Sequence, residues 1–164
     1  MARRLTAGII IAYLIAVVQT TIGGRLALAG AAPDLLLVWV VCIGLLAGPR
    51  VGMVAGFACG LIEGSLLQAS VGALAISKGV AGLGAGVISG AVSRDHWLAP
   101  PLAAAVLTVA AEAVFLLLSP VSGWTHAARL IVVRVVYHAA LSVVAFAAIS
   151  RGWRVTGEPN QGVA

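Results

Sequence analysis

The sequence predicts an all-α membrane protein built as one bundle of six transmembrane helices. Hydrophobic residues make up 62% of the 164 residues and charged residues only 9%, compared with roughly 45–50% and about 25% in soluble domains. The mean hydropathy of +1.12 and the 20 glycines are also typical of lipid-embedded helices. So few charges cannot cover a water-exposed surface, which excludes soluble enzymes and nucleic-acid-binding proteins. The apolar runs also lack the alternation of a transmembrane β-barrel.

The first two predicted spans cover about residues 5–22 and 34–47. The first run could be a signal peptide, because Ala27-Leu28-Ala29 resembles a cleavage site. Every later segment is also membrane-like, however, and we expect a retained span. Pro33 and Asp34 suit the start of the second helix. A spanning helix typically needs about 17–25 residues, and several of the predicted segments are short by this measure. Spans two and three could be tilted, broken or partly shielded by protein.

The remaining spans follow from the breaks between them. Gly48-Pro49-Arg50 is a turn before the third span, a short polar break precedes the fourth, Pro100 opens the fifth, and polar loops flank the sixth. The four spans cover about residues 51–67, 73–92, 100–118 and 127–149. We therefore expect a single transmembrane domain over residues 1–150, and a polar cytoplasmic tail over residues 151–164 with too few apolar residues to pack.

The net charge of +5 indicates topology rather than a site for a polyanion, because the arginines are scattered between apolar runs. With six spans, one side of the membrane holds six arginines and the other holds only Arg25 and Arg129. Cytoplasmic loops carry the excess of basic residues, so both termini are expected in the cytoplasm. The six arginines are Arg3, Arg4, Arg50, Arg94, Arg151 and Arg154.

Four ionisable residues lie inside predicted spans: Glu63, Lys78, Glu112 and Arg134. Each would cost several kcal/mol if it faced lipid, so partners are expected. In an antiparallel helix pair, residues equidistant from the connecting loop lie at similar depth. On this ground Glu63 is predicted to pair with Lys78, and Glu112 with Arg134, both in the outer half of the membrane.

Thr108 and His138 lie one helical turn deeper than Glu112 and Arg134 and extend the same polar seam. We expect His138 to be a hydrogen-bonded core residue, because no second His or Cys is placed to share a metal. The charge pairs themselves have three interpretations: they fix which helices are neighbours, they line a ligand or proton pathway, or they contact a partner's helix.

Glycines recur at every fourth position on two spans. Such faces let helix backbones approach closely in lipid. They can pack the third and fourth spans against each other, or one of them can receive a helix of another protein. The glycines of these two faces are Gly52, Gly56, Gly60 and Gly64 on the third span, and Gly82, Gly86 and Gly90 on the fourth.

The sequence contains no motif for catalysis. It lacks a nucleophile with a base at usable spacing, a phosphate-binding loop and a pair of carboxylates on one helix face. Cys42 and Cys59 fall in apolar stretches and are expected to be free, buried thiols. We therefore expect neither an enzyme nor a bound metal or cofactor.

Two segments, Pro33-Asp34-Leu35-Leu36-Leu37-Val38 and Gly56-Phe57-Ala58-Cys59-Gly60-Leu61-Ile62-Glu63, followed by Gly72, resemble the motif of the rod shape-determining protein MreD family. Residues 73–79 also look like the start of the fourth span in some members. The resemblance implies a non-enzymatic scaffold of the elongation machinery in the bacterial cytoplasmic (inner) membrane. It also implies binding to the bitopic protein MreC, and work with the MreB cytoskeleton, a RodA-like glycosyltransferase and a class B penicillin-binding protein in peptidoglycan synthesis and cell-shape control.

The same resemblance suggests a rival function. The MreD family is similar in fold to the substrate-binding S components of energy-coupling-factor vitamin transporters, and the two charge pairs could line such a pocket. Against this alternative, the chain has only 4 Trp, 2 Tyr and 3 Phe, few for a site that stacks a vitamin ring. An ion-coupled transporter is less favoured, because no internal repeat is evident.

Overall fold

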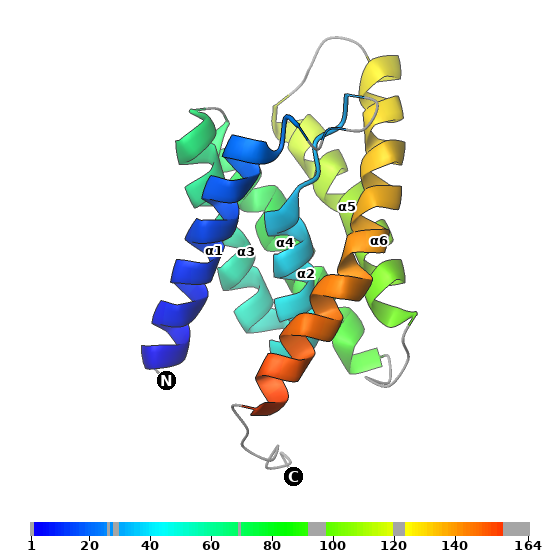
Figure 1. Cartoon of the computed structure of the whole chain (residues 1–164). Helices are drawn as coiled ribbons and strands as arrows, with labels where there is room; N and C mark the ends of the chain where they lie inside the picture. The colour runs from blue at the N-terminus through cyan, green and yellow to red at the C-terminus, as the bar shows by residue number, and fades with distance from the viewer. Residues whose placement is uncertain are drawn as a thin grey trace.

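The computed structural model describes residues 2–25, 27, 30–68, 70–91, 98–119 and 124–155. The described residues form six α-helices gathered in one bundle (Figure 1), as expected of an all-helical membrane protein. The start of α1 and the end of α6 lie at the same end of that bundle. The helices are α1 (Ala2–Ile22), α2 (Leu35–Ala47), α3 (Pro49–Leu67), α4 (Val71–Ala91), α5 (Ala99–Leu118) and α6 (Trp124–Val155).

Local sequence explains where several helices begin and end. The Asp34 carboxylate caps α2, because its Oδ1 accepts the Leu37 N–H at 2.8 Å. Gly48 ends α2 with a φ of 87°, a left-handed value that favours glycine. Pro49 then begins α3, since proline fits the first position of a helix. This tight junction starts α3 two residues before the predicted 51–67 span.

The structure corrects the predicted start of the tail at residue 151, because α6 continues to Val155, inside the segment 151–164. Loss of apolar residues ends the part of a helix that suits lipid, but it does not end the backbone hydrogen bonding. The apolar part of α6 is Ala128–Arg151. Residues 156–164 of the expected tail, and Arg94 of the expected cytoplasmic side, lie outside the described residues.

Within the described residues, four helices contain apolar stretches that are long enough to cross a membrane: Pro49–Leu67, Val71–Gly90, Pro100–Leu118 and Ala128–Arg151. Large apolar side chains point outward from the bundle, as Leu117 (78% exposed) and Val144 (70% exposed) show. By contrast, Lys78 is only 2% exposed. Apolar residues on the outside and charged residues within are the arrangement of a multi-pass membrane protein.

The short helix α2 lies at the centre of the bundle and packs against the five other helices. At 13 residues it is about 20 Å long, less than the roughly 30 Å of a hydrocarbon core. Its neighbours shield it from lipid, and Leu36, Val40 and Cys42 are fully buried. The expectation that a short span is shielded by protein therefore fits α2.

The two glycine faces pack against each other. A side chain at Gly52, Gly56, Gly60 or Gly64 would overlap backbone atoms of α4, and one at Gly82 would overlap the backbone of α3. Gly86 packs in the same way against Pro49 at the start of α3. Gly90 is exposed and has no such neighbour. Apart from Gly90, the glycine faces of α3 and α4 are therefore filled within the bundle and are not free for a helix of another protein.

Candidate ligand cavity

A cavity of about 380 Å³ opens among the helices, and each of the six contributes to its lining. The lining residues come from the ends of α1, α3 and α5 and from the starts of α2 and α4. The cavity therefore lies in the half of the bundle away from the start of α1. Its polar lining consists of Gln19, Thr20, Asp34, Glu63, Ser77, Lys78, Glu112 and Arg134, and its larger apolar residues are Leu37, Leu67, Leu74 and Phe115.

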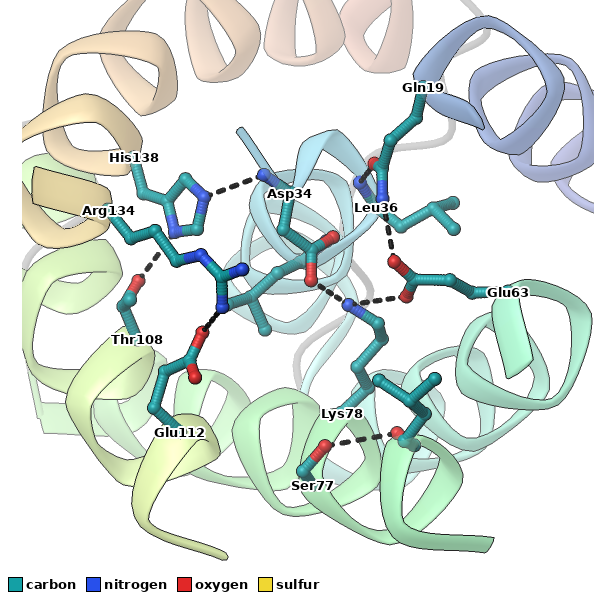
Figure 2. Close-up of polar contacts among 12 residues, drawn as sticks. Gln19, Asp34, Leu36, Glu63, Ser77, Lys78, Thr108, Glu112, Arg134 and His138 are labelled. Atoms are coloured by element: carbon teal, nitrogen blue, oxygen red, sulfur yellow. Dashed lines mark hydrogen bonds and ion pairs between the residues drawn. The ribbon is translucent and has the colours of Figure 1, made fainter. Parts of the chain in front are cut away.

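Lys78 lies between two carboxylates. Its Nζ forms an ion pair with Asp34 Oδ2 and lies 2.9 Å from Glu63 Oε2. Figure 2 shows the lysine reaching from α4 to the space between these two groups. A buried ammonium is stable only when it is paired and hydrogen-bonded. Asp34 and Glu63 therefore hold the loop before α2 and the end of α3 to α4.

Gln19 joins α1 to the same cluster. Its Nε2 donates to Glu63 Oε1 at 2.7 Å, and its Oε1 accepts the Leu36 N–H at 3.1 Å. Because a backbone N–H can only donate, the second bond fixes which end of the amide is the oxygen. Gln19 thus satisfies one of the free N–H groups at the start of α2 as well as a carboxylate oxygen.

His138 is held by hydrogen bonds to both ring nitrogens. Its Nε2 accepts the Asp34 N–H at 2.9 Å, and its Nδ1 lies 2.9 Å from Thr108 Oγ1. The Thr108 hydroxyl donates to the Ala104 carbonyl at 2.6 Å, so the Nδ1–H of His138 donates to Thr108. One neutral tautomer of the ring, with its proton on Nδ1, accounts for all of these hydrogen bonds. His138 therefore carries no charge and ties α6 to the loop before α2.

The second ion pair joins Arg134 Nη1 of α6 to Glu112 Oε1 of α5 (Figure 2). The Arg134 side chain is 32% exposed and that of Glu112 is 15% exposed. The Nε of Arg134 is buried and has no hydrogen-bond partner among the described residues. This pair therefore leaves an unused donor at the cavity wall.

The structure brings together both acid–base pairs that we predicted from depth, Glu63 with Lys78 and Glu112 with Arg134. It also joins Thr108 to His138. Sequence reasoning missed Asp34 and Gln19 as members of the cluster. Asp34 was assigned only to the start of a helix, and Gln19 was not considered because only ionisable residues were sought. A polar residue in an apolar run was the available signal for Gln19.

Comparison with known proteins corrects the family that the sequence suggested. The family described as 5TMR of 5TMR-LYT matches residues 2–151, which include all of α1 to α5 and most of α6. No curated protein and no solved structure matches the chain.

The resemblance to the MreD family is therefore wrong, and so is the function drawn from it, a scaffold of the rod machinery. The motif behind it consists mostly of glycines, a proline and apolar residues, together with the two acids Asp34 and Glu63, which pair with Lys78. Those residues serve general purposes here, because the glycines pack α3 on α4 and Pro33-Asp34 opens α2.

Proposed function

Because the chain belongs to the 5TMR of 5TMR-LYT family, a family of membrane sensor domains, we propose that it senses a small molecule bound in its cavity. The observation that carries the proposal is the convergence of five charged side chains on one space of about 380 Å³. Cavities of roughly 300–1,000 Å³ with a few polar groups on an apolar wall are typical of small-molecule sites.

The ion pairs give such a site a means of signalling. Lys78 contacts Asp34 before α2 and Glu63 on α3, and Arg134 contacts Glu112 between α6 and α5. A molecule that replaces one of these contacts changes which helices are held together. Binding then shifts the equilibrium between two arrangements of the bundle, to an extent set by the difference in the ligand's affinity for the two.

The arginines support one orientation of the sensor. The end of the bundle where α1 starts holds five of the described arginines, and the other end holds two, Arg25 and Arg129. The five are Arg3, Arg4, Arg50, Arg151 and Arg154. Under the positive-inside rule, the first end faces the cytoplasm and the cavity lies toward the outside. We propose that the protein lies in the bacterial cytoplasmic membrane, with the start of α1 and the end of α6 on the cytoplasmic side.

The proposal involves binding and no catalysis. No group of three or more His, Cys, Asp or Glu that could hold a metal occurs within the described part of the chain. The partners expected from the MreD resemblance are not carried into the proposal. The exposed apolar side chains of the bundle suit contact with the lipid bilayer.

The test uses a substitution that places a large side chain at the edge of the cavity. Thr20 lines the cavity, and its hydroxyl bonds only to carbonyls of its own helix, at Ala16 and Val17. Thr20→Trp therefore blocks space without removing a contact between helices. Thr21→Trp is the matched control, because Thr21 is exposed, bonds likewise to Val17 and is absent from the lining.

Unfolding of the purified protein in mild detergent can be followed with a thiol-reactive dye, because Cys42 and Cys59 are free and buried. We expect a panel of small polar metabolites to contain at least one that stabilises wild type and Thr21→Trp but not Thr20→Trp. If every stabilising compound acts equally on both variants, or none stabilises wild type, the cavity is not the sensing site.

A further inference from the structure

The charges of the cavity specify the kind of molecule that it accepts. The lining holds three carboxylates, Asp34, Glu63 and Glu112, and two cations, Lys78 and Arg134. His138, which contacts Asp34, is neutral in the hydrogen-bond arrangement described above. With all three carboxylates ionised, the lining therefore holds one more negative charge than positive charge in a low-dielectric surrounding, where an unpaired charge is costly.

One buried donor in this cavity also lacks a hydrogen-bond partner among the described residues. Arg134 Nε is a donor without an acceptor. A buried polar atom left in this state costs about 1–3 kcal/mol. A ligand that supplies an acceptor to Arg134 Nε removes this cost.

The size and the wall of the cavity favour an organic ligand over a metal ion. A water molecule occupies about 30 Å³ in the liquid, so about 380 Å³ exceeds what a single hydrated ion requires. Leu37, Leu67 and Leu74 offer an apolar surface. Phe115 also lines the cavity, and an aromatic face attracts a cation.

We propose that the cavity binds a small organic amine that is a monocation and carries a hydrogen-bond acceptor. The ammonium lies among the carboxylates of Asp34, Glu63 and Glu112, and the acceptor lies at Arg134. This inference rests on the proposed sensing function and names the chemical class of its ligand.

The test compares four probes with the full chain in lipid nanodiscs at neutral pH. The amine is 4-aminobutan-1-ol, and its matched analogues are the neutral butane-1,4-diol and the zwitterion 4-aminobutanoate. Potassium chloride tests an inorganic monocation. We expect the amine to bind about tenfold or more tightly than each of the other three probes by calorimetry. We also expect Glu112→Gln to weaken amine binding by about tenfold, whereas the control Thr21→Val leaves it unchanged.

Equal binding of the amine and the diol would overturn the inference, because charge would then not be recognised. Preferred binding of the zwitterion or of potassium would also overturn it, but the sensing cavity would stand. Absence of binding by all four probes would likewise overturn the amine class. The proposed function fails separately, through the Thr20→Trp comparison.

Discussion

Lys78→Met is the most informative perturbation of the charge cluster. Methionine retains the length and most of the volume of the lysine stem but removes the ammonium. The two carboxylates that contact it, Asp34 and Glu63, have side chains only 21% and 7% exposed. Without Lys78 they face each other across the cavity as two like charges in a low-dielectric surrounding.

Removing one partner of a buried ion pair costs about 3–5 kcal/mol, and here one cation serves two acids. We expect the loss of stability in Lys78→Met to fall in the upper half of that range, mainly because of Glu63, which is the more buried acid. Asp34 retains the Leu37 N–H and contributes less. For a chain of this size about 1 kcal/mol corresponds to roughly 2–4 °C in Tm, so the midpoint should fall by roughly 10 °C.

The assay is thermal unfolding in mild detergent with a thiol-reactive dye that reads exposure of Cys42 and Cys59. A second variant, Lys78→Met with Glu63→Gln, restores the net charge of the cluster and should recover more than half of the loss. Arg151→Met is the matched control, since Arg151 is an exposed cation on α6. If the double variant is no more stable than Lys78→Met, Lys78 and Glu63 are not energetically coupled and the reasoning is refuted.

Three further predictions use the same assay. Glu112→Gln should destabilise more than the double change with Arg134→Gln, because a lone charge is the costly state; equal loss would mean that the two do not pair. Gly56→Ala should cost about 1–3 kcal/mol, because the new methyl group overlaps the α4 backbone. Gly90→Ala, with open space around it, should be neutral or stabilising by up to about 1 kcal/mol, and a similar loss in both variants would exclude close packing as the cause. His138→Ala should cost about 1–3 kcal/mol by leaving the Asp34 N–H unpaired, and an unchanged midpoint would show that water replaces the ring.

The sequence alone determined the class of the protein. Its apolar runs and scarcity of charge require a lipid environment, where a chain must satisfy its backbone hydrogen bonds internally and therefore forms helices. The same scarcity made the intramembrane charges easy to find. Helices joined by short loops place residues equidistant from the loop at equal depth, which is why the pairing of Glu63 with Lys78, and of Glu112 with Arg134, was predictable.

Tertiary structure decided the rest, because it depends on contacts between helices that are not consecutive. Asp34 is 44 residues from Lys78 and 104 from His138 along the chain, and no local pattern links them. They meet because α2 lies at the centre of the bundle, where its first turn faces both α4 and α6. A degenerate motif of glycine, proline, apolar residues and two acids likewise reports how helices pack and pair, and packing alone does not identify a family. The set of charged groups that line the cavity, and with it the kind of ligand that we propose, follows only from that three-dimensional arrangement.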